Sequence, residues 1–75
     1  MTGKELIKNL MTEKKVTNAD MARALGISQA ALWDRLNPKK TNNMTIVNLS
    51  KMLEQLGYEI IVKEKDGTIE YRLSE

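Results

Sequence analysis

The chain contains no cysteine and no histidine, and it has only one proline and one tryptophan among its 75 residues. Without cysteine it can form neither a disulfide bond nor a thiolate metal site, which fits a reducing compartment. It also lacks the run of about 18 apolar residues that a transmembrane helix needs, and no signal peptide is visible at its start. We therefore expect a cytoplasmic protein with no membrane segment.

Motifs that carry catalysis are missing as well. The chain has no glycine-rich nucleotide-binding motif, and Ser28, Ser50 and Ser74 have no obvious base to activate them. Its carboxylates are scattered and do not follow the spacing of metal ligands. We expect no enzymatic activity, no cofactor and no metal.

Size and charge suggest what the chain binds. With 41% hydrophobic and 29% charged residues it is an ordinary globular domain. A domain of this length buries only ~60% of its unfolded surface, so a partner subunit would stabilise it considerably. Residues 1–40 carry eight Lys or Arg against four acidic residues, whereas residues 41–75 carry four against six. The first half is therefore the half suited to binding phosphate.

Residues 17–37 contain two short amphipathic segments joined by a tight turn. Their apolar side chains recur at helical spacing at Met21, Ala22, Leu25, Leu32 and Leu36. Gly26 can take the left-handed conformation that ends the first helix, and Ser28 can cap the second. Helices joined by so short a turn must cross steeply. This stretch is predicted to be a helix-turn-helix, with its second helix a candidate for the DNA major groove.

The rest of the chain adds two helices and a hairpin. Capping residues and periodicity predict helices over 3–14, 18–25, 28–36 and about 45–56. From Tyr58 the apolar period changes to two, and Asp66-Gly67 predicts a hairpin with a type I′ turn. That turn places Val62 opposite Tyr71, Ile60 opposite Leu73 and Lys63 opposite Glu70.

The predicted fold class is therefore mostly α with a C-terminal β-hairpin (α+β). Four helices are followed by a two-stranded antiparallel hairpin. Residues 1–57 form the helix-turn-helix part of one compact domain, and residues 58–75 form the hairpin.

The helix-turn-helix resembles that of the lambda-repressor and Cro-type family. The matching positions are apolar Met21, small Ala22, apolar Leu25, Gly26, Ile27, Ser28 and apolar Leu32. A basic loop and a further helix ending in Leu56-Gly57 continue the likeness over residues 4–57. The sequence departs from the family at Asn18, where Gln is common, and at Arg35, where an apolar residue is usual. The tail from Gly57 to Val62 is similar to the C-terminal strand of HipB-type antitoxin repressors.

The resemblance implies a prokaryotic or phage transcriptional repressor that binds a palindromic operator as a homodimer. Gln29 occupies the position of the family's main base-reading residue, and its amide can bond adenine. On the same outward face, Ala30 can touch a thymine methyl or serve only as a helix former. Trp33 can contact sugar and thymine, or cover the loop after Pro38 and pack beside the last helix. Asp34 can accept from cytosine, or pair with Arg35 or Lys39.

Contacts to the DNA backbone are expected from both sides of that helix. Thr17 and Asn18 open the preceding helix, where free N–H groups favour a phosphate. Ser28 and Asn37 flank the helix over 28–36 that is expected to read the bases, called the reading helix below, although Asn37 can instead bond its own main chain. The donor-rich loop after Pro38 completes the set with Lys39, Lys40, Thr41, Asn42 and Asn43.

The hairpin is expected to form the dimer interface. Its candidate contact residues are Tyr58, Ile60, Ile61, Val62, Ile69, Tyr71 and Leu73. Two copies would hold their reading helices about one DNA turn apart, ~34 Å. The alternative is a monomer whose hairpin docks on its own helices. An alternative function is an antitoxin or a phage or plasmid regulator that acts mainly by binding a partner protein.

Overall fold

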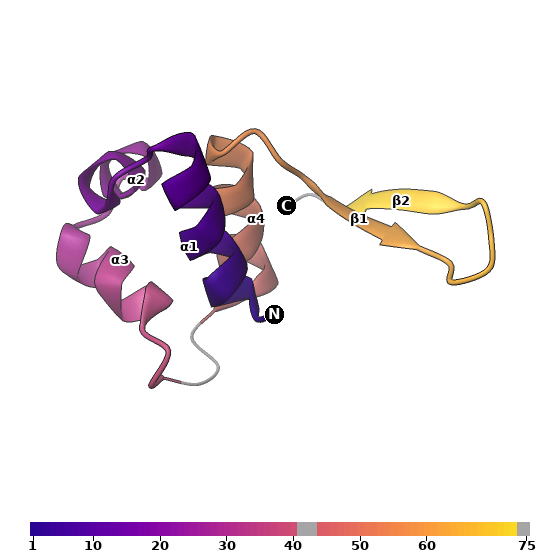
Figure 1. The fold of residues 1–75 in the computed structure, drawn as a ribbon, viewed down its shortest axis with the longest axis horizontal. Helices are drawn as coiled ribbons and strands as arrows, with labels where there is room; N and C mark the ends of the chain where they lie inside the picture. The colour runs from indigo at the N-terminus through magenta and orange to yellow at the C-terminus, as the bar shows by residue number, and fades with distance from the viewer. Residues whose placement is uncertain (41–43, 74–75) are drawn as a thin grey trace.

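The computed structural model describes residues 1–40 and 44–73 and contains the four helices and two strands that the sequence predicts (Figure 1). The elements are α1 (Gly3–Lys14), α2 (Asn18–Leu25), α3 (Gln29–Leu36), α4 (Ile46–Gln55), β1 (Ile60–Lys63) and β2 (Glu70–Leu73). None of the helices in these ranges is long and apolar enough to span a bilayer.

Each helix begins at a hydroxyl side chain, as predicted. The side chains of Thr2, Thr17, Ser28 and Thr45 accept a backbone N–H from the residue three positions ahead, at 3.0–3.1 Å. These bonds satisfy donors that have no acceptor inside the helix. Local sequence therefore determines where every helix starts.

Two helices end at glycines in the left-handed conformation. Gly26 has φ +69° after α2, and Gly57 has φ +86° after α4. Helix α1 ends differently, because Lys15 takes φ 57° with no glycine to ease it. The N–H of Val16 still donates to the carbonyl of Met11 at 2.8 Å and closes the turn. A non-glycine residue pays about 1–2 kcal/mol for this conformation.

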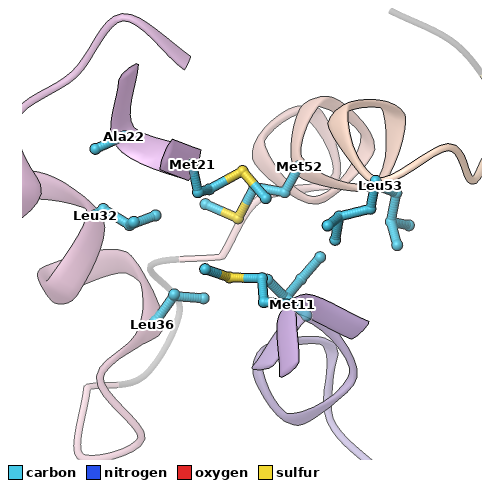
Figure 2. Close-up of a cluster of buried hydrophobic side chains, with 9 residues drawn as sticks. Met11, Met21, Ala22, Leu32, Leu36, Met52 and Leu53 are labelled. Atoms are coloured by element: carbon cyan, nitrogen blue, oxygen red, sulfur yellow. The ribbon is translucent and has the colours of Figure 1, made fainter. Parts of the chain in front are cut away.

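The helices enclose one small core that is rich in methionine. Figure 2 shows Met11, Met21 and Met52 pointing toward one another from α1, α2 and α4. Leu32 and Leu36 enter this core from α3 and are 0% and 4% exposed. The burial of both leucines establishes the rotation of α3 about its axis, so Leu36 takes the core position that Arg35 cannot.

The hairpin has the predicted register but not the predicted turn. Ile60 pairs with Leu73, Val62 with Tyr71, and Lys63 with Glu70. Neither Asp66 nor Gly67 has the positive φ that a type I′ turn requires, so that prediction is wrong. Gly67 is needed for space instead, because a Cβ there would stand 2.9 Å from Cβ of Glu64.

The hairpin extends away from the helices and does not pack over them (Figure 1). Ile60 alone among the expected interface residues is half-buried against the helical core. Tyr58 is held at the base of the hairpin, where the Lys14 ammonium lies 5.2 Å from its ring centroid. The other apolar side chains are exposed, at Ile61, Val62, Ile69, Tyr71 and Leu73. Within the described residues, the helices therefore leave most of the hairpin uncovered.

Candidate nucleic-acid interface

The outward face of α3 begins at Gln29 and Ala30, in the first turn of the helix. Both side chains are exposed, because the buried Leu32 and Leu36 turn this face away from the core. The Ser28 hydroxyl accepts the N–H of Ala31 at 3.0 Å and holds the start of the helix. The Gln29 amide is thus presented at a rigid, capped helix end, where it can reach a base edge.

Trp33 lies on the same face, one helical turn after Gln29. Its side chain is 63% exposed, so the indole is not buried beside the last helix. The indole instead lines an open cavity between α1, the start of α2 and the end of α3. An exposed indole on this face is available to a ligand.

Asp34 forms an ion pair with Lys40, a residue that was not among its predicted partners. The Lys40 ammonium donates to the Asp34 carboxylate, and both side chains are about half exposed. The pair lies on the side of α3 that faces the following loop. Lys40 is therefore engaged within the chain, whereas Lys39 is an exposed cation beside it.

Thr17 and Asp20 form a reciprocal capping box at the start of α2. The Thr17 hydroxyl accepts the N–H of Asp20 at 3.1 Å, and the Asp20 carboxylate accepts the N–H of Thr17 at 3.2 Å. The hydrogen bond from the Thr17 backbone N–H is the largest cause of the lowered pKa of Asp20. The Thr17 side chain and the Arg23 guanidinium lower this pKa further. The N–H groups of Asn18 and Ala19 have no acceptor within the helix and point out of its end.

Asn37 folds onto its own main chain, as one of its two interpretations predicts. Its side-chain oxygen accepts the N–H of Lys39 at 3.0 Å, which starts the loop after α3. Two side chains of α1 that the sequence pattern does not mark as functional approach this region. Lys4 donates to the carbonyls of Asn37 and Lys40 at 2.6 Å each, and Lys8 lines the cavity next to Trp33. Their only signal in the sequence is a spacing of four on one helix face.

The expected backbone contacts at Thr41, Asn42 and Asn43 lie outside the described residues. Among the described positions, Thr17, Asn18, Ser28, Lys39 and Lys40 are exposed. Gln29 and Trp33 share the outer side of α3, and the Thr17–Asn18 helix start shares a cavity with Trp33.

Two helices crossing at a glycine turn, the second with an exposed outer face, define a helix-turn-helix DNA-binding protein. Residues 6–60 match the profile of the Cro/C1-type HTH DNA-binding domain. Because the match covers most of the sequence, the chain belongs to this family and is a DNA-binding domain. No curated protein and no solved structure matches the chain. Domains of this family are typical of transcriptional regulators without enzymatic activity.

Proposed function

We propose that the protein is a sequence-specific transcriptional repressor that binds a palindromic operator as a homodimer. The observation that carries this proposal is the outward face of α3, where Gln29, Ala30 and Trp33 are exposed while Leu32 and Leu36 anchor the helix. A helix held in this way can enter the major groove with its first turn against the bases. Such a regulator acts in the cytoplasm of a prokaryotic cell.

Base recognition is assigned mainly to Gln29. Its amide can donate to and accept from adenine N6 and N7 together, and the small side chain of Ala30 lets the helix approach a thymine methyl. Asp34 is less suited to base recognition, because its ion pair with Lys40 must rearrange before its carboxylate can accept a hydrogen bond from cytosine. Sequence preference should therefore centre on the base pair that Gln29 faces.

Backbone contacts position the protein and carry no sequence information. The Asn18 and Ala19 amides at the start of α2 suit one phosphate. Lys39 and the loop that follows suit the strand on the other side of α3. Lys40 contributes only after leaving Asp34.

The exposed hairpin supports the homodimer. Its apolar face is not covered by the chain's own helices, with Val62 51% and Tyr71 65% exposed. An isolated two-stranded hairpin is marginally stable in water. A second copy that pairs or stacks its hairpin on this face would cover it and place two α3 helices ~34 Å apart. In this proposal residues 1–57 bind DNA and residues 58–75 dimerise.

Selection of bound sequences from a random DNA pool at two salt concentrations tests the function. We expect an enriched inverted repeat whose binding weakens as salt rises. Gln29→Ala should cost about 1–3 kcal/mol and relax one position in each half-site. Gln55→Ala, at the far end of α4, is the matched control and should leave the motif unchanged.

An unenriched pool with weak, salt-sensitive binding would overturn specific regulation. The exposed hairpin would then favour the second candidate function, in which this surface binds a partner protein as in an antitoxin.

A further inference from the structure

A cavity of about 530 Å³ opens beside the reading helix, between α1, the start of α2 and the end of α3. Its lining is Lys8, Met11, Thr12, Val16, Thr17, Asn18, Trp33, Leu36, Asn37 and Pro38. The apolar members are aliphatic or aromatic, and the polar members are mostly donors. Among these described lining residues none is acidic. This composition suits a ligand with an apolar body and an anionic end.

Among the described lining residues, Lys8 is the single cation. It is exposed on α1, one helical turn after Lys4. Lys4 is less available to a ligand, because its ammonium already donates hydrogen bonds to the carbonyls of Asn37 and Lys40. The Thr12 hydroxyl is also engaged, since it donates to the Lys8 carbonyl at 3.0 Å. Lys8 is therefore the cation positioned to meet an anion at this cavity.

Trp33 forms the aromatic part of the same lining. Its indole is 63% exposed and stands one helical turn beyond Gln29. With α3 in the major groove, a strand that flanks the groove at Gln29 would pass in front of this indole. Deoxyribose presents an apolar ring face, and an indole covers such a face without needing a particular base. The phosphate next to that sugar would lie toward α1.

We propose that this cavity holds one sugar–phosphate unit of the DNA backbone, with Lys8 binding the phosphate and Trp33 packing against the deoxyribose. The inference rests on the proposed insertion of α3 into the major groove. It assigns a backbone role to α1 and gives Trp33 a positioning role in place of base reading. Both contacts should strengthen binding to every sequence equally.

The only tryptophan of the chain makes the contact directly observable. Tryptophan emission should shift to shorter wavelength when the selected operator is added, and quenching by acrylamide should fall severalfold in the complex. Emission and quenching that stay at their free-protein values, while a labelled operator reports binding by anisotropy, would overturn the packing of Trp33.

Charge variants at position 8 test the phosphate contact. Lys8→Gln should weaken binding about three- to tenfold on operator and random DNA alike, and lower the salt slope by about 0.9 per bound chain. Lys8→Arg keeps the charge and should restore both values. Lys51→Gln, exposed on α4, is the matched control and should behave as the unmodified protein.

These outcomes separate the inference from the proposed function. If the unmodified protein selects no operator, the proposed function fails. If it selects one and Lys8→Gln binds like Lys51→Gln, then only the backbone contact of α1 fails.

Discussion

The ammonium of Lys4 donates to the main-chain carbonyl of Asn37 at 2.6 Å, across 33 positions of sequence. The same ammonium donates to the carbonyl of Lys40, also at 2.6 Å. One side chain of α1 thus holds both ends of the turn that leaves the reading helix. Because this turn ends at Lys40, α1 holds the described start of the basic loop, Lys39 and Lys40, in place relative to α3.

Replacing Lys4 should loosen the turn. Lys4→Met removes both bonds and keeps the aliphatic stem, so we expect the free energy of unfolding to fall by about 1 kcal/mol in a partly exposed site. DNA binding should weaken on all sequences, with the selected motif unchanged. Urea unfolding and binding to operator and random DNA measure the two effects.

Lys4→Arg keeps a charged donor and serves as the control. A loss of binding confined to the operator would contradict a role in positioning the loop.

The left-handed Lys15 offers a stabilising change. Lys15→Gly should raise the free energy of unfolding by up to about 1 kcal/mol, because glycine adopts this conformation without the Cβ penalty. Lys15→Ala removes the charge but keeps the Cβ, so it should not stabilise. Thermal unfolding of the unmodified protein and the two variants measures these changes in stability. Equal increases in stability from glycine and alanine would rule out backbone strain as the cause.

The capping box at α2 should make stability depend on acid. The pKa of Asp20 is lowered in the folded chain, so its contribution is present above the pKa of an unfolded aspartate, about 4. That contribution is lost as pH falls through the lower folded pKa. Asp20→Asn should therefore be less stable than the unmodified protein at neutral pH, with the difference shrinking at low pH.

Melting temperatures measured from neutral pH down into the acid range test this sign. A difference that grows toward low pH would contradict the capping role of the carboxylate.

A single substitution in the apolar face of the hairpin should disrupt the proposed dimer. Val62→Lys places a charge at the centre of the exposed face, so it should convert the dimer to a monomer and leave the helices folded. Lys63→Gln, on the opposite face, should remain dimeric. Sedimentation and circular dichroism measure mass and helix content. A single-chain mass for the unmodified protein at tens of micromolar would contradict the hairpin dimer.

The hairpin illustrates which predictions from sequence hold. Its register follows from the alternation of apolar residues on both strands, because a slip by one residue would place the apolar residues of one strand beside the polar residues of the other. The turn type depends on the backbone conformation of Asp66 and Gly67 and on the Glu64 side chain, which lies next to Gly67. A two-residue signal does not specify that packing.

The candidate interface divides in the same way. The position of Gln29 and the role of Ser28 as a cap follow from local spacing, so the sequence predicts them. The sequence predicts an ion pair of Asp34 with Arg35 or Lys39, and the structure places the Lys40 ammonium against its carboxylate. The pair with Lys40 depends on how the chain turns between Asn37 and Lys40.

The sequence alone determined the helix-turn-helix, because caps, glycines and apolar spacing act within a few residues of one another. Those short-range signals establish each helix and the face that it buries. The tertiary structure decided what lies around the reading helix: Lys4 holds the turn after α3, Lys8 and Trp33 line one cavity, and the hairpin stands away from the core. The contacts of Lys4 and the cavity of Lys8 and Trp33 join residues 25 to 36 positions apart, and the packing of α1 against the other helices brings them together.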